Sequence, residues 1–227
     1  MKRLLLLSMV IFNDHLLSAQ ENPFMIDANG KPLFWGSQYV ADGSPYFHDE
    51  YNWAEITTVN GKVYKDIRVK FNVLERQIQY LHDDGKEMVT TMPIKSIHFP
   101  AISGENNVLV NVLLQSGDGA MNTASSTIYQ VLEPGKVSLA RKIDITSRDE
   151  KKYGEAVITR HFERKETDHV LLANGEAVKL EKNRSFISDL LKDKKTEIDA
   201  YISTNNIKCK SLKDFQLIIG YYNSLVK

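Results

Sequence analysis

The sequence predicts an α+β protein in which a mainly antiparallel β-sheet or sandwich of about eight or nine strands precedes a C-terminal hairpin of two helices. Two observations carry this prediction. Residues 57–99 contain three runs of alternating apolar and polar residues, separated by two turn signals, which is the pattern of a solvated antiparallel meander. After Glu181 the spacing of apolar residues changes from two to the period of an amphipathic helix.

The meander is defined by its turns. Asn60-Gly61 is a strong hairpin signal, and the strand after it, residues 63–73, alternates strictly in its second half. Its Val, Ile and Phe residues predict a buried face, while Arg68, Lys70 and Asn72 face the other way. A second turn at residues 83–86 leads into a strand that Pro93 ends or confines to an edge.

More strands follow along the chain. The apolar run VLVNVLL, residues 108–114, fits a buried strand, and Pro134-Gly135 and Asn174-Gly175 predict two further hairpins. Residues 146–154, TSRDEKKYG, read as a solvated connection, so the last strands are expected at 156–162 and 170–180.

Two amphipathic helices are expected at the C-terminus. The first carries its apolar face from Ile187 to Ile202 and stops at Asn205-Asn206. Ser211 and Asp214 form a capping-box variant that starts the second. The two faces are expected to pack on the sheet or on each other, and the alternative is a hairpin that docks a partner protein.

The N-terminus predicts export. A basic start, an apolar run from Leu4 to Phe12 and a cleavage motif ending at Ala19 make residues 1–19 a signal peptide; the alternative is a buried N-terminal helix. The apolar run is shorter than the roughly 20 residues that span a bilayer. The single cysteine, Cys209, is far from the cleavage site, so we expect a periplasmic or secreted protein without a lipid anchor or transmembrane segment.

The expected organisation therefore has four parts. The signal peptide is followed by an extended arm at residues 20–34, an antiparallel β domain at 35–181 and the helical hairpin at 182–227 packed on it. The chain has 29 basic and 29 acidic residues, interleaved along its length. Nucleic acids and anionic membranes are therefore disfavoured as partners, because their binders usually show a basic excess.

Residues 35–53 are dense in aromatic side chains, with Gly and Pro between them. One interpretation is a loop that plugs one end of the sheet core, since aromatic residues bury large areas. The other is an exposed surface that binds a glycan, peptide or lipid. The residues of this candidate ligand or partner surface are Trp35, Tyr39, Tyr46, Tyr51 and Trp53.

No motif predicts catalysis or a bound cofactor. The six histidines form no metal-binding motif, although His161 and His169 could meet across a hairpin. Hydrolase, P-loop and dinucleotide-binding signatures are missing from the sequence. Cys209 lies between two lysines, which would favour the thiolate if it were exposed. We therefore expect no catalytic, cofactor or metal site.

Two segments, GSPYFHDEYNWAEITTVNGKVYKDIRVKFNVLERQIQYL at residues 43–81 and the helical tail at 186–225, together resemble uncharacterised exported proteins of the Bacteroidota. The two segments cover about a third of the chain. It implies a secreted envelope protein of a diderm cell, and it brings no catalytic residues.

These observations lead to three functional hypotheses. The first is an exported, non-enzymatic envelope protein that binds another protein or a cell-surface component. The second is a periplasmic carrier that holds a lipid or other hydrophobic ligand between a curved sheet and the helices, suggested by VLVNVLL, by Met88 and Met92 and by the apolar helix faces. The third is a glycan-acting hydrolase that uses Asp or Glu.

Overall fold

The structure is a computed structural model that describes residues 31–32, 39–100, 108–113, 126–154 and 157–226. The expected signal peptide, most of the expected extended arm and Trp35 lie outside these residues. The described part of that N-terminal segment, Lys31–Pro32, is strand β1, which pairs with β6 at the edge of the sheet.

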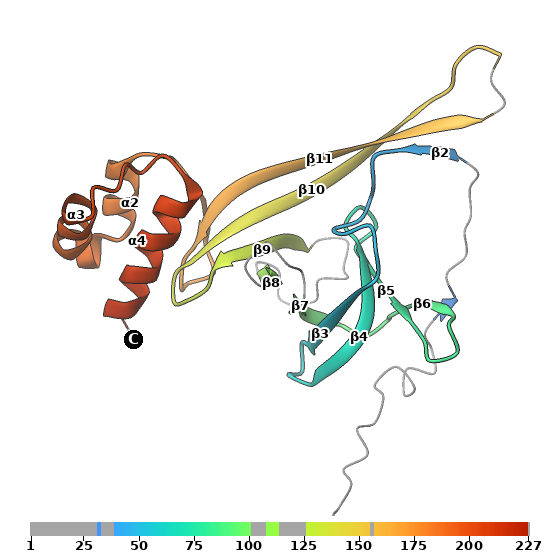
Figure 1. Ribbon diagram of the computed structural model, residues 1–227, viewed down its shortest axis with the longest axis horizontal. Helices are drawn as coiled ribbons and strands as arrows, with labels where there is room; N and C mark the ends of the chain where they lie inside the picture. The colour runs from blue at the N-terminus through green and yellow to red at the C-terminus, as the bar shows by residue number, and fades with distance from the viewer. Residues whose placement is uncertain (1–30, 33–38, 101–107, 114–125, 155–156, 227) are drawn as a thin grey trace, which may run out of the picture.

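The described strands form one continuous sheet in the order β1-β6-β5-β4-β3-β7-β8-β9-β10-β11-β12, with β2 paired to β11 (Figure 1). Every pairing is antiparallel except that of β2 with β11. The prediction of an α+β fold with C-terminal helices is confirmed. The strands are β1 Lys31–Pro32, β2 Tyr39–Asp42, β3 Asn52–Thr58, β4 Val63–Asn72, β5 Gln77–Leu81, β6 Glu87–Val89, β7 Ile94–Phe99, β8 Val108–Leu113, β9 Thr127–Glu133, β10 Ser138–Glu150, β11 Ile158–Leu171 and β12 Ala177–Lys179.

The turns of the meander lie where the sequence places them. The Asn60-Gly61 turn joins β3 to β4, and Gly61 has the positive φ of 84° that such a turn requires. Pro93 lies between β6 and β7, outside both strands, where its missing N–H does not interrupt a strand ladder. One pairing departs from a simple meander, because β7 crosses back to pair with β3 instead of β6.

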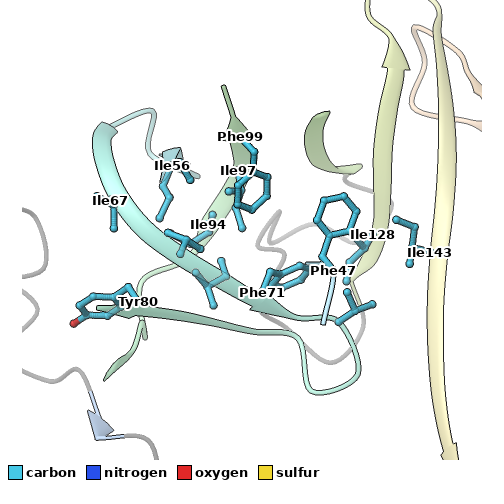
Figure 2. Close-up of a cluster of buried hydrophobic side chains, with 14 of the residues drawn as sticks. Phe47, Ile56, Ile67, Phe71, Tyr80, Ile94, Ile97, Phe99, Ile128 and Ile143 are labelled. Atoms are coloured by element: carbon cyan, nitrogen blue, oxygen red, sulfur yellow. The ribbon is translucent and has the colours of Figure 1, made fainter. Parts of the chain in front are cut away.

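The main hydrophobic core lies inside the curve of the sheet. Alternate residues of β4 supply Ile67, Val69 and Phe71, which are at most 7% exposed. Ile143 and Ile145 of β10 belong to the same cluster, so the curved sheet brings distant strands together around it (Figure 2). Phe47 belongs to the aromatic segment at residues 35–53, and its side chain lies in this core at 4% exposure. A loop that plugs the core would place it there.

Strands β10 and β11 form a long ribbon, the arm, which corrects two sequence expectations. Residues 146–150 belong to β10 rather than to a connection, and β11 is continuous across residues 163–169. Ser138–Glu150 pair one by one with Leu171–Thr159. The prediction failed because both faces of these segments are polar. Cross-strand pairs of opposite charge, such as Asp149 with Arg160, stabilise the ribbon instead.

The C-terminal unit contains the α-helices α2 Arg184–Leu190, α3 Lys195–Thr204 and α4 Leu212–Leu225, with a 3₁₀ turn, η1 Lys192–Lys194, after α2. The first expected helix is therefore two helices. A continuous helix would place Lys194, seven residues after Ile187, on the apolar stripe. The break keeps Leu191 buried at 1% exposure while Lys194 reaches Glu197.

The helices gather at the end of the β10–β11 ribbon where β10 begins and β11 ends (Figure 1). Their apolar faces form a second core with one another and with Val137, Leu139, Val170 and Leu180 of the neighbouring strands and turns. Asn223 of α4 locks this contact. Its amide accepts a hydrogen bond from the Val137 N–H at 3.1 Å and donates to the Val137 carbonyl at 2.8 Å and the Pro134 carbonyl at 3.3 Å.

Candidate functional site

The outer face of strand β4 carries a cluster of aromatic and basic side chains. Lys70 points outward because its neighbours Val69 and Phe71 face the core. Its ammonium lies 4.0 Å from the ring centroid of Tyr46 and 5.9 Å from that of Tyr51. Both distances fall within the range of cation–π attraction, so one lysine holds two tyrosines of the aromatic segment against the sheet.

Trp53 and Arg68 extend this cluster along the sheet. Trp53 of β3 lies directly opposite Arg68 of β4 in the strand register, and its side chain is 54% exposed. Tyr51 lies two residues before Trp53, so the two rings share one side of the extended chain. We call the five residues Tyr46, Tyr51, Trp53, Arg68 and Lys70 the Lys70 patch.

Polar neighbours fix the tyrosines from the adjacent strands. Gln79 of β5 lies opposite Lys70 and is 2% exposed. Burial raises the pKa of Tyr46, which Gln79 partly offsets by a hydrogen bond. Burial also raises the pKa of Tyr51, and the nearby Glu87 carboxylate raises it further. Both phenols are therefore neutral at physiological pH. The hydroxyl of Tyr51 is buried, so Tyr51 presents ring surface to a ligand and not its O–H group.

Tyr39 lies in a different place from the patch. It begins β2, which pairs with β11 in the arm, and the guanidinium of Arg160 lies 4.5 Å from its ring centroid. Its ring is also 6.2 Å from that of Phe162. Of the five predicted surface residues, the structure thus brings Tyr46, Tyr51 and Trp53 together, places Tyr39 on the arm, and leaves Trp35 outside the described residues.

The basic members of the patch, Arg68 and Lys70, were missing from the predicted surface. The signal for them was present in the alternation of β4, which assigns both to the solvent face. Their proximity to the aromatic segment could not be read from the sequence. It follows from the return of that segment to β4, where Phe47 N–H bonds the Phe71 carbonyl at 2.9 Å and Val73 N–H bonds the Pro45 carbonyl at 2.9 Å.

The histidines and the cysteine singled out in the sequence lie apart or buried among the described residues. No group of three or more His, Cys, Asp or Glu residues among them could hold a metal ion. Cys209 is buried at 1% exposure, and burial raises the pKa of its thiol, which makes it a poor nucleophile. His161 and His169 do not meet across a hairpin, because both lie on the same strand, β11.

Comparison with protein-family models, curated proteins and solved structures finds no match to the chain. Among the described residues, no helix has the length and apolar character needed to cross a membrane.

Proposed function

We propose that the protein is an exported, non-enzymatic envelope protein that binds a partner protein through the Lys70 patch. The observation that carries this proposal is the gathering of Tyr46, Tyr51 and Trp53 with Arg68 on one solvent-facing stretch of sheet. Tyr, Trp and Arg are the residue types that dominate the binding energy of protein interfaces. The pattern of a signal peptide at residues 1–19 supports export.

The patch is preorganised for binding. Its strand positions are fixed from behind by Val69 and Phe71, which are 0% and 1% exposed. Lys70 restrains the rings of Tyr46 and Tyr51 from the front. A partner therefore does not have to order these side chains, and the entropic cost of immobilising them, of about 0.5–1.5 kcal/mol for each flexible side chain, is reduced.

The arrangement of the helices does not favour the carrier hypothesis. That hypothesis needs the apolar helix faces to lie over the curved part of the sheet. Instead they pack in their own cluster at the end of the β10–β11 ribbon, with Ile198, Ile202 and Phe215 each at most 2% exposed (Figure 1). Met88 and Met92 pack against the separate core inside the sheet.

The proposal is tested by affinity capture from envelope fractions with three forms of the protein. The test variant is W53A/R68E, and the matched control is L217A, which truncates an exposed apolar residue, 47% exposed, on α4. Captured proteins are identified by mass spectrometry, and the dissociation constant of each candidate is then measured with purified partner.

We expect a partner that binds the wild type and L217A equally and binds W53A/R68E at least about thirty-fold more weakly, since loss of a hot-spot residue costs about 2 kcal/mol or more. Circular dichroism and thermal unfolding verify that all three forms are folded. If the captured proteins and their affinities are the same for W53A/R68E and L217A, the patch is not the binding site.

A further inference from the structure

A short connection with two lysines leaves the arm at the end opposite the helices (Figure 1). Lys151, Lys152, Tyr153 and Gly154 follow Glu150, the last residue of β10, and all four are exposed, Tyr153 fully. They form no hydrogen bond or ion pair with another described residue. A methyl group in place of the Gly154 hydrogen would meet no atom within 4 Å. We call these four residues the arm connection.

The arm connection lies beyond both hydrophobic cores. Ile145 is the last β10 residue in the main core, and residues 146–150 after it are polar. They are held by pairing with β11 and by exposed ion pairs such as Asp149 with Arg160, which add little stability. Opening the end of β10 therefore costs much less than unfolding the core. This opening supplies the few extended residues that a protease cleft binds.

The lysines in the hairpin turns are anchored. Lys62 donates its N–H to the Thr58 hydroxyl at 3.1 Å, and its carbonyl accepts from the Thr58 N–H at 2.9 Å. The Lys86 carbonyl accepts a backbone hydrogen bond of 2.9 Å across its own turn. Lys136 lies in the β9–β10 turn, whose backbone Asn223 holds from α4. Each turn would have to break before its lysine could enter a protease cleft.

The connection between α3 and α4 offers the closest comparison with the arm connection. It also carries two exposed lysines, Lys208 and Lys210. Between them, however, Cys209 is buried at 1% exposure, and the Lys210 N–H donates to the Asp214 carboxylate at 2.8 Å. The backbone there is fixed even though the ammonium groups are exposed. Exposed lysines on a backbone without such bonds therefore distinguish the arm connection.

The segments outside the described residues contain no competing lysine after the N-terminus. Residues 33–38, 101–107, 114–125 and 155–156 have none, so a protease that requires lysine cannot cut within them. Lys2 lies in the expected signal peptide. The bond after Lys31 leads to Pro32, whose ring replaces the N–H on the leaving-group side.

We propose that the arm connection is a processing site for a serine protease that cleaves after lysine. The Lys152 ammonium enters the specificity pocket, where a carboxylate pairs with it, and the Lys152–Tyr153 peptide bond is hydrolysed. Water adds across this bond, which leaves a free carboxylate on Lys152 and a free amine on Tyr153. Lys152 is better placed than Lys151, because Lys151 directly follows the paired residue Glu150.

The cut chain stays together as a molecule of two chains. Ser138–Glu150 remain paired with Thr159–Leu171, which joins one piece to the other along the whole arm. Val137 and Leu139 of the first piece pack among the helices of the second. The Lys70 patch lies entirely on the first piece, so the cut leaves it intact. Processing at the arm connection is thus independent of the partner bound by the patch.

The test digests the folded full chain with a small amount of a lysine-specific endoprotease. Mass spectrometry and N-terminal sequencing identify the first internal cut, and size-exclusion chromatography reports whether the pieces separate. The test variant is K151Q/K152Q. The matched control is K208Q/K210Q, which also removes two exposed lysines from a connection. Circular dichroism verifies that both variants are folded.

We expect the first cut in the wild type to produce a fragment that begins at Tyr153, and the cut protein to elute as the intact chain does until denaturant is added. Cleavage of K151Q/K152Q should be at least about ten-fold slower, since an opening that costs about 1.4 kcal/mol more is ten-fold rarer. K208Q/K210Q should be cut as fast as the wild type. Envelope fractions of cells that express the chain should contain the fragment that begins at Tyr153.

Four results would overturn the proposal. The first is that the initial internal cut follows Lys208, Lys210 or another lysine outside the arm connection. The second is that K151Q/K152Q is cut as fast as the wild type. The third is that the pieces separate on size exclusion without denaturant. The fourth is that envelope fractions contain only the intact chain, which would make the connection sensitive to added protease but not a processing site.

Discussion

Asn223→Ala should weaken the attachment of the helical unit to the β9–β10 turn. The Asn223 amide makes three hydrogen bonds of 2.8, 3.1 and 3.3 Å to the backbone of Val137 and Pro134. At about 1 kcal/mol for each bond, the loss is roughly 3 kcal/mol. Val137 is 4% exposed, so water replaces its lost partners poorly. We expect the free energy of unfolding to fall by about 2–3 kcal/mol.

Urea unfolding followed by circular dichroism measures this loss, and hydrogen exchange of the Val137 amide locates it. The matched control is Ser224→Ala, at the next position of α4, where the hydroxyl is exposed and donates only to the Tyr221 carbonyl within its own helix. That change should stay within about 0.5 kcal/mol of the wild type. If Asn223→Ala costs no more than Ser224→Ala and leaves Val137 exchange unchanged, the locking role is refuted.

Gly135→Ala tests the same contact from the opposite side. A Cβ at Gly135 would lie 2.0 Å from Nδ2 of Asn223, so the amide would have to leave its hydrogen bonds. The φ of 156° at Gly135 adds backbone strain for any other residue. We expect Gly135→Ala to cost less in the Asn223→Ala background than in the wild type, because only the strain remains there. Equal costs in both backgrounds would contradict the proposed clash.

Two further predictions concern pH. Hydrogen bonds from the backbone N–H groups of Lys210, at 2.8 Å, and Ser211, at 3.2 Å, lower the pKa of Asp214. The stability that Asp214 contributes is therefore present above the ordinary pKa of about 4 and lost as the pH falls. Asp214→Ala should lower the free energy of unfolding by about 1 kcal/mol near neutral pH and by less in acid, measured by urea unfolding across that range. Burial raises the pKa of Tyr46 and Tyr51, so the folded state retains their protons more strongly than the unfolded chain. Their stabilising effect is complete below about pH 10 and lost as the pH rises, and Y46F/Y51F should reduce that alkaline loss relative to the wild type.

The sequence predicted the elements whose signals are local. The Asn60-Gly61 turn, the alternation of β4 and the capping box at Ser211 each depend on residues a few positions apart, and each lies where expected. The break before α3 was missed. The apolar spacing continues from Ile187 to Ile202, and the break depends on Leu191 packing into the second core while Lys194 reaches Glu197.

The arm was missed for a different reason. A strand that is polar on both faces has no hydrophobic alternation, and its stability comes from partners on another strand. Arg141 with Asp168 and Asp149 with Arg160 are such partners, 27 and 11 residues apart. Tyr39 was grouped with Tyr46 by proximity in sequence, but its parallel pairing with Ile158 takes it to the arm.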